Sequence, residues 1–233
     1  MSGARPSDRA GSASAPFVVA ACGLALEARI AAGRGVRSVA GGVDARRLAA
    51  ELEREVGRGA RAIVSFGIAG ALVPGLEAGE CVVARGVVAP GRYWSSDEAW
   101  TARLRQRMPR ARFGDVAASD RPLASAAQKR AMFDHTNALA VDTESHVAAA
   151  IAAAHRLPFA AIRVIADAVS RDLPPAASVA LKAGGRVDVA RVAGSILAAP
   201  SQLPLLARTA RDAHVAFAAL RDVRKRLGDG LGL

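Results

Sequence analysis

The stretch from Leu139 to Asp167 constrains the fold of this chain more than any other part of the sequence. An apolar run, Leu139–Val141, leads into four polar residues and an alanine-rich helical segment, and a second apolar run, Phe159–Ala166, ends at Asp167. This order of strand, helix and strand predicts a βαβ unit with parallel strands. Because ligands of open α/β sheets bind beyond the carboxyl ends of such strands, we expect Glu144 and Asp167 to meet at one edge of the sheet.

The polar residues at these strand ends also have an ordinary structural interpretation. Asp142 or Ser145 would cap the following helix through its free N–H groups, and Asp167 would simply open a loop. Arg163 is the one charge inside the second apolar run, and we expect it to pair with an acid and hold that acid ionised. Alternatively, two carboxylates at one edge divide the work of general acid and of sugar or water ligand.

Length and composition favour a single folded domain. The 233 residues, 52% of them hydrophobic, suffice for one α/β domain with a sizeable core and exclude a disordered chain. No apolar run approaches the roughly 18 residues that a membrane span needs. Residues 1–16 are small, polar and basic, which predicts a disordered leader ahead of a domain over residues 17–233. Cys22 and Cys81 lie in apolar segments without metal-ligand spacing, so we expect buried thiols in a reducing cytoplasm, no metal site and no cofactor.

The net charge of +11 raises the question of nucleic-acid binding. The basic residues are spread along the chain and aromatic residues make up only 4%, so neither a basic patch nor a base-stacking platform is visible. We therefore expect an arginine-biased solvated surface and no nucleic-acid partner. The basic C-terminal helix predicted over Leu203–Leu227 leaves peripheral contact with an anionic membrane as the minority interpretation.

Two glycine-containing segments lie nearer the N-terminus. The strand Phe17–Cys22 ends at Gly23, where the start of a helix can present N–H groups to an anion, and Glu27 is either a first-turn acid favoured by the helix dipole or a functional acid. Ala62–Ser65 is a predicted strand, and the run Gly67-Ile68-Ala69-Gly70 after it predicts a glycine-rich turn that lets the backbone approach a ribose or a phosphate.

Four further segments complete the predicted order. Helices are predicted over residues 44–56 and 126–136, the second ending at Asn137, and over 187–199. The run Gly91–Trp94 predicts a loop whose aromatic residues lie near a pocket or an oligomer interface. The proline-rich residues after Asp167 predict a loop long enough to cover a site, and residues 179–182 continue a short helix.

The run Val141–Ser145, the run Arg163–Asp167 and the glycine segment together resemble the nucleoside phosphorylase and nucleosidase superfamily, over about Phe17 to Ala199. The resemblance implies a three-layer α/β/α domain with a central mixed twisted sheet. It also implies a homo-oligomer, with a dimer as the expected state. It implies that Asp167 protonates the leaving purine, that Glu144 binds the ribose hydroxyls, and that Glu27 activates a water. Residues Gly67, Ile68, Ala69 and Gly70 would line the substrate.

Three departures from the superfamily pattern alter the expected site. Ser65 and Ile68 replace the arginine and serine that hold phosphate in hexameric phosphorylases, so a phosphate would need Gly23 N–H, Arg29 or Arg92. Thr143 replaces the usual methionine under the ribose. Pro122 and Leu123 stand where relatives place a purine-stacking phenylalanine.

Within the superfamily the chain looks most similar to the hopanoid-associated phosphorylases. That resemblance implies release of adenine from adenosylhopane, with phosphate as co-substrate, by a cytoplasmic enzyme that could contact the inner membrane face. The alternative is a hydrolytic nucleosidase of the methylthioadenosine/S-adenosylhomocysteine type, and a further alternative is a non-catalytic nucleoside-binding relative.

Overall fold

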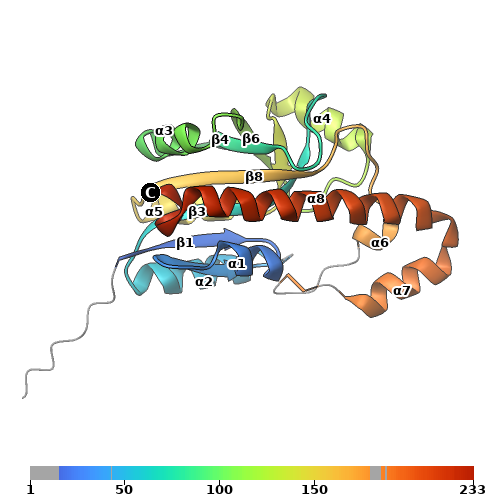
Figure 1. The fold of residues 1–233 in the computed structure, drawn as a ribbon, viewed down its shortest axis with the longest axis horizontal. Coiled ribbons are helices and arrows are strands. Elements are labelled where there is room, and N and C mark those ends of the chain that lie inside the picture. The colour runs from blue at the N-terminus through green and yellow to red at the C-terminus, as the bar shows by residue number, and fades with distance from the viewer. Residues whose placement is uncertain (1–15, 43, 179–184, 187) are drawn as a thin grey trace, which may run out of the picture.

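The computed structural model describes residues 16–42, 44–178, 185–186 and 188–233 (Figure 1). The expected leader lies outside the described residues except for Pro16, and so do the helix expected over 179–182 and the first residue of the one expected from 187. The strands are β1 (Phe17–Cys22), β2 (Val36–Ala40), β3 (Ala60–Ala71), β4 (Cys81–Ala89), β5 (Arg92–Ser95), β6 (Arg112–Ala118), β7 (Ala140–Asp142) and β8 (Phe159–Asp167). The helices are α1 (Ala25–Ala31), α2 (Ala45–Gly57), α3 (Glu98–Arg107), α4 (Ala126–Thr136), α5 (Ser145–Ala154), α6 (Pro175–Ser178), α7 (Val189–Ala198) and α8 (Leu203–Leu227), with 3₁₀ turns η1 (Pro200–Gln202) and η2 (Asp229–Gly232).

All eight strands belong to one mixed sheet. Its path runs β2-β1-β3-β7-β6-β4-β5, and β8 pairs with both β3 and β4. The pairing β3–β7–β6–β4–β8–β3 therefore closes on itself, which makes a ring of five strands with β1 and β2 extending from one side. A strongly twisted sheet can curve until its first and last strands pair. This sheet therefore has a closed part, the ring, and an open part, β1 and β2.

Helices cover both faces of the sheet, which confirms the predicted three-layer α/β/α fold (Figure 1). Successive strand residues point to opposite faces, so Val19 and Ala21 pack with α2 and α5, whereas Val18 and Ala20 pack with α1, α3 and α8. Each large aliphatic side chain buried in this way contributes roughly 1.5–3 kcal/mol. The strand predicted over Phe17–Cys22 and the helix predicted over Ala126–Thr136 are confirmed residue for residue, and Asn137 ends the helix in the left-handed conformation with φ of 52°.

The C-terminal helices differ in how they pack. α8 lies along β8, where Leu220 and Leu227 are fully buried (Figure 1). α7 contributes no buried residue. Among the described residues no single helix is long and apolar enough to cross a membrane, although α7 and the segment Pro200–Leu227, bent by 111° relative to each other, pass that test together.

The sequence-based interpretation was wrong at three places in the sheet. Gly67–Gly70 form no turn, because β3 continues through them to Ala71. The aromatic run after Gly91 is not a loop but strand β5, which forms a hairpin with β4. The predicted parallel βαβ unit is also wrong, because β7 pairs antiparallel with β3 whereas β8 pairs parallel with it. Because the strands close into a ring, β7 and β8 pair with opposite edges of β3 and do not have to run in the same direction.

Candidate functional site

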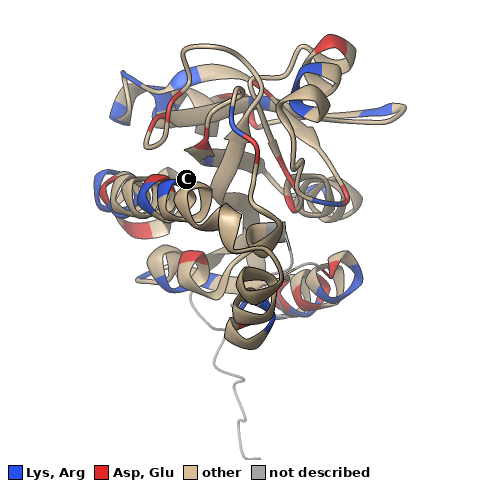
Figure 2. Cartoon of the chain, turned by 90° about the vertical axis from the view of Figure 1, so that its right-hand side faces the viewer, with Lys and Arg blue, Asp and Glu red and all other residues tan. Residues whose placement is uncertain are grey.

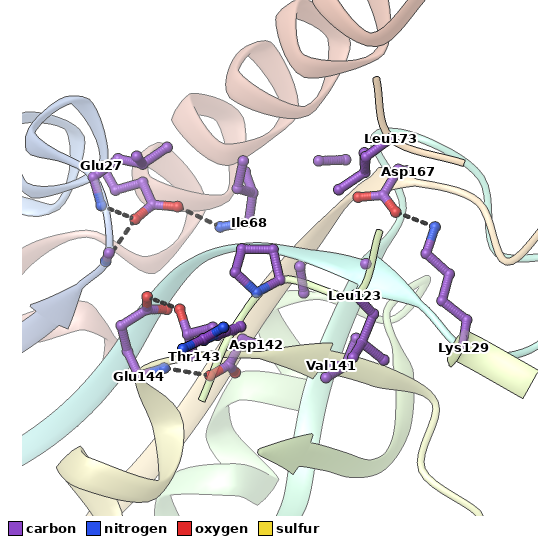
Figure 3. Close-up of a pocket in the computed structure, with 17 residues that line it drawn as sticks. Glu27, Ile68, Leu123, Lys129, Val141, Asp142, Thr143, Glu144, Asp167 and Leu173 are labelled. Carbon is purple, nitrogen blue, oxygen red and sulfur yellow. Dashed lines mark hydrogen bonds and ion pairs between the residues drawn. The ribbon is translucent and has the colours of Figure 1, made fainter. Parts of the chain in front are cut away.

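A cavity of about 160 Å³ opens where β3, β7 and β8 end together. Gly70 pairs with Val141 on one side and Asp167 on the other, so the reversed direction of β7 still brings both strand ends to one place. Figure 3 shows Glu27, Thr143 and Glu144 at one end of the cavity and Asp167 with Lys129 at the other. The lining residues are Gly23, Leu24, Glu27, Ile68, Ala69, Gly70, Arg121, Pro122, Leu123, Lys129, Val141, Asp142, Thr143, Glu144, Ala166, Asp167 and Leu173.

Glu27 is held by backbone N–H groups from two segments. Its Oε2 accepts from the N–H groups of Gly23 (2.8 Å) and Leu24 (2.7 Å), and its Oε1 accepts from the N–H of Ile68 (2.7 Å). A Cβ on Gly67 would lie 2.5 Å from Glu27 Oε1, so glycine at this strand position makes room for the carboxylate. Because a carboxylate offers about four acceptor sites, Glu27 keeps capacity for a hydrogen bond from a molecule in the cavity.

Glu144 belongs to a buried charge network behind the cavity wall. Arg163, fully buried, pairs through Nε with Asp142 at 2.8 Å and lies 3.7 Å from Glu144. Asp142 also accepts from the backbone N–H groups of Glu144 (2.8 Å) and Ser145 (2.7 Å). Glu144, and neither Asp142 nor Ser145, is the N-cap residue of α5, and Asp142 supports the start of this helix from two residues before the cap. Thr143 Oγ1 donates to Glu144. Arg163 pairs with an acid as predicted, and it lies beside Glu144 at the end of the cavity where Glu27 and Glu144 meet.

Burial dominates the ionisation of the two glutamates. It raises the pKa of Glu144 to about 8, with Arg163 lowering it and Asp142 and Glu27 raising it. Burial also raises the pKa of Glu27, against the opposing effects of Arg163 and the three backbone N–H groups. Arg163 stays charged, because the carboxylates of Asp142, Glu144 and Glu27 raise its pKa more than burial lowers it. Glu144 is therefore readily protonated near neutral pH.

Asp167 is joined to a buried lysine at the opposite end. The Lys129 ammonium, 1% exposed, donates to Asp167 Oδ2 and to the carbonyl oxygens of Ala168 (2.9 Å) and Arg171 (2.8 Å). These three acceptors use all three donors of an ammonium. Burial raises the pKa of Asp167 and Lys129 lowers it, with a net rise. Asp167 can therefore take up and release a proton beside a fixed positive charge.

Apolar side chains surround this acidic end of the cavity. Leu123, Val141 and Leu173 lie around Asp167 in Figure 3. Leu173 belongs to the proline-rich loop that follows β8, so that loop does cover part of the cavity as expected. This end of the cavity therefore combines apolar side chains with one carboxylate.

The structure brings together most, but not all, of the residues that the sequence suggested. Glu27, Glu144, Asp167, Thr143, Ile68, Ala69, Gly70, Pro122, Leu123 and Gly23 line the cavity. Gly67 lies behind Glu27, outside the lining. Arg29 and Arg92 are exposed on α1 and β5 and do not line the cavity, and the N–H of Gly23 already donates to Glu27. The three groups suggested for phosphate therefore do not converge.

Sequence reasoning missed Lys129 and Leu173 as neighbours of Asp167. Lys129 lies inside the helix predicted over residues 126–136, for which the sequence indicated no functional role. One signal was present, because the chain has only three lysines against many arginines, which makes a lysine at 129 unusual. Leu173 carries no such signal, since its position depends on the path of the loop after β8.

Comparison with known proteins assigns the family. The model of the phosphorylase superfamily matches residues 14–198, so the chain belongs to that superfamily. The protein is thus an enzyme of this superfamily, with the cavity as its candidate active site. A search of curated protein sequences finds no match.

Solved structures with the same fold are distant in sequence. A 5′-methylthioadenosine/S-adenosylhomocysteine nucleosidase from Streptococcus pneumoniae, with a transition-state inhibitor, has a TM-score of 0.58 and 17% identity, covering 88% of this chain and 98% of that one. The corresponding nucleosidase from Helicobacter pylori, with 5′-methylthioadenosine in its active site, has a TM-score of 0.62 and 13% identity, covering 88% and 96%. Futalosine hydrolase from Helicobacter pylori has a TM-score of 0.57 and 14% identity, covering 89% and 97%.

Proposed function

We propose that the protein cleaves the N-ribosyl bond of an adenine nucleoside, with water as the nucleophile. The observation that carries the proposal is the division of the cavity into a two-glutamate end and an aspartate–lysine end. Such a site can stabilise a ribosyl cation at one end and a departing base at the other. The similarity of the fold to nucleosidases that bind adenine nucleosides supports this class of substrate.

Asp167 and Lys129 would act on the leaving base. The base lies between Leu123, Val141 and Leu173, and Asp167 gives its proton to N7 as the bond from N9 to C1′ breaks. The bonding electrons remain on the purine, where the proton at N7 neutralises them, and the Lys129 ammonium stabilises the Asp167 carboxylate that is left. The raised pKa of Asp167 supports its role as the acid.

Glu144 and Glu27 would act on the sugar and the water. Glu144 binds the ribose hydroxyls, and Thr143 and Arg163 hold its carboxyl group in place. Glu27 accepts a proton from the water whose oxygen bonds to C1′, and that proton replaces the one lost by Asp167 when the site exchanges with solvent. Three backbone N–H groups fix the orientation of Glu27, which favours a defined position for the water.

Water is favoured over phosphate because of the charges at the sugar end. A phosphate beside Glu27 and Glu144 would need cations. The described lining contains one lysine and one arginine, Lys129 and Arg121. All three donors of Lys129 are already engaged with Asp167 and two carbonyl oxygens. Burying a phosphate without paired donors is costly. Phosphorolysis stays the second candidate, with Arg121 as the cation that it would recruit.

The 5′ group of the nucleoside would extend into an adjoining cavity of about 230 Å³, which shares Pro122, Thr143 and Glu144 with the first. Asp44, Asp120 and His146 also line this second cavity, which supports a 5′ substituent with a polar end. The adenosylhopane substrate suggested by resemblance is the competing proposal, supported by the apolar lining that Leu24 and Ile68 add to the first cavity.

The test follows adenine release from 5′-methylthioadenosine and from a 5′-alkyl adenosine, each with and without phosphate. We expect equal rates in both buffers and the free 5-substituted ribose (5-methylthioribose from 5′-methylthioadenosine) as the sugar product. Strict dependence on phosphate with the 5-substituted ribose 1-phosphate as product would replace hydrolysis by phosphorolysis. A clear preference for the 5′-alkyl substrate would favour the adenosylhopane proposal, and the absence of adenine release from both would refute nucleoside cleavage.

A further inference from the structure

Among the residues that the structure describes, none covers the surface built by α7, η1 and the first part of α8 (residues 189–211, called here the apolar hairpin). Val189 is 73% exposed, Leu197 82% and Leu203 49%. Val215, 40% exposed, continues the same surface along α8. The remaining large hydrophobic side chains exposed in the described residues, Tyr93 and Phe113, belong to β5 and β6. Exposed apolar side chains are therefore concentrated at one end of the molecule.

The apolar hairpin is held in place by a buried glutamine at its corner. Gln202 Nε2 donates to Ser195 O at 2.7 Å, and Gln202 Oε1 accepts from the N–H of Ala176 at 2.9 Å. Gln202 thus joins α7, α8 and α6 at one point. Burying a leucine side chain stabilises a protein by roughly 1.5–3 kcal/mol, and an exposed leucine lacks this free energy. An ordered apolar surface of this kind therefore marks an interaction site.

The charges of the apolar hairpin are all of one sign. Between residues 189 and 211 the charged residues are Arg191, Arg208 and Arg211, each exposed, and the sequence has no acid there. At the borders, Asp188 lies 3.5 Å from Arg191, and Asp212 lies 4.0 Å from Arg171. Figure 2 faces this end of the molecule, and the helices nearest the viewer are mostly tan with a few blue residues. Apolar side chains bordered by arginines match the chemistry of an anionic lipid surface.

We propose that the apolar hairpin docks on an anionic lipid bilayer, with Leu197 and Val189 entering the interfacial region and the three arginines contacting lipid phosphates. A second copy of this chain is a poorer occupant of this particular surface, because Arg191, Arg208 and Arg211 would make both facing rims basic. The inference rests on this surface alone and does not depend on the proposed reaction.

Docking of the hairpin has a geometric consequence for the cavity. Leu173, which lines the cavity, is followed directly by Pro174 and α6, and α6 is tied to the hairpin through Gln202. Figure 1 shows α6, α7 and the first turns of α8 together at one end of the molecule. The bilayer would therefore lie on the side of the covering loop, where an amphiphilic molecule could pass between the lipid and the cavity.

The experiment is co-sedimentation of the full chain with phosphatidylcholine vesicles, with and without phosphatidylglycerol. We expect binding only to the anionic vesicles. Loss of one arginine, as in Arg208→Gln, should weaken partitioning about fivefold, and Leu197→Glu should weaken it about tenfold or more. Both positions are exposed, so neither change should disturb folding.

Ala102→Glu is the matched control, because it places the same charge on an exposed helical position of α3, at the opposite end of the molecule (Figure 1). Binding that survives Ala102→Glu and fails with Leu197→Glu supports the proposal. Equal weakening by both variants would reduce the effect to general charge attraction and overturn the proposal. Absence of binding to anionic vesicles, or a solution dimer that Leu197→Glu dissociates without any vesicle binding, would overturn it as well.

Discussion

Replacing Arg163 by methionine tests the charge network behind the end of the cavity that Glu27 and Glu144 line. Methionine keeps an unbranched side chain of moderate volume but removes the cation that pairs with Asp142 and Glu144. The variant therefore leaves buried carboxylates without their counter-charge. We expect it to fold less stably and to lose order around Glu144.

The size of the effect follows from burial. Arg163 and Asp142 are 0% and 1% exposed in their side chains, and removal of one partner from such a buried pair costs roughly 3–5 kcal/mol. For a domain of this length each kcal/mol lowers the melting temperature by about 2–4 °C, which gives a fall of roughly 6–20 °C. The double variant Arg163→Met/Asp142→Asn should cost less than the sum of the two single changes, because it removes both charges.

The cost should also depend on pH. The pKa of Glu144 is about 8 with Arg163 present, and loss of Arg163 raises it further, since Arg163 lowers it. The carboxyl group of Glu144 is neutral in both proteins well below pH 8. Above pH 8 it ionises in the wild type, whereas in the variant its ionisation is opposed. The difference in stability between the two proteins should therefore grow as the pH rises through 8.

Urea denaturation at pH 6 and pH 9 measures this difference, with Arg92→Met as the control. Arg92 is exposed on β5, so the same chemical change there should stay within about 0.5 kcal/mol of wild type. A cost for Arg163→Met below about 1 kcal/mol, or one identical at the two pH values, would refute the account given for this network.

Four further predictions concern the acids and the assembly. Asp167→Asn should lower kcat/KM for adenine release by roughly 10²–10⁴-fold while the protein stays folded, whereas Asp134→Asn, an exposed change on α4, should leave activity intact. Lys129→Met should raise the pKa of Asp167, because Lys129 lowers it. The alkaline limb of the pH profile of kcat/KM should therefore move to higher pH. An unchanged limb would show that Lys129 does not influence the ionisation of the catalytic acid. The stability of the wild type should fall between pH 4.5 and 8, because in this range the Glu144 carboxyl group loses its proton in the unfolded chain but keeps it in the folded one. Glu144→Gln should remove this fall, which urea midpoints across the range measure. Light scattering should give a multiple of 23.9 kDa, and a mass of one chain at micromolar concentration would contradict the expected homo-oligomer.

The sequence predicted the elements well where local pattern decides them. A short continuous apolar run predicted β1, and Asn137 was predicted as the end of α4. The structure adds a Ser125–Gln128 capping box at the start of α4. The motifs also indicated Glu27, Glu144 and Asp167, which the structure places in one cavity. Local pattern carries this information because caps and strand periodicity depend on neighbouring residues.

The sequence failed where the answer depends on strand partners. Glycines normally predict a turn, yet Gly67 is a strand residue because Glu27, forty residues earlier in the chain, fills the space beside it. The direction of β7 is set by its pairing with β3 and β6, which no local pattern encodes. Lys129 reaches Asp167 only once α4 packs on the ring.

The closed ring also orders events during synthesis of the chain. β8 leaves the ribosome after the other four ring strands, and it pairs with β3 along nearly its whole length and with the start of β4. Until residue 167 has emerged, β3 and β4 each expose an unpaired edge, the kind of surface that invites aggregation or chaperone binding. The last residue of that strand is Asp167 itself. Chains released before this point thus lack both the strand that closes the ring and one of the carboxylates that line the cavity.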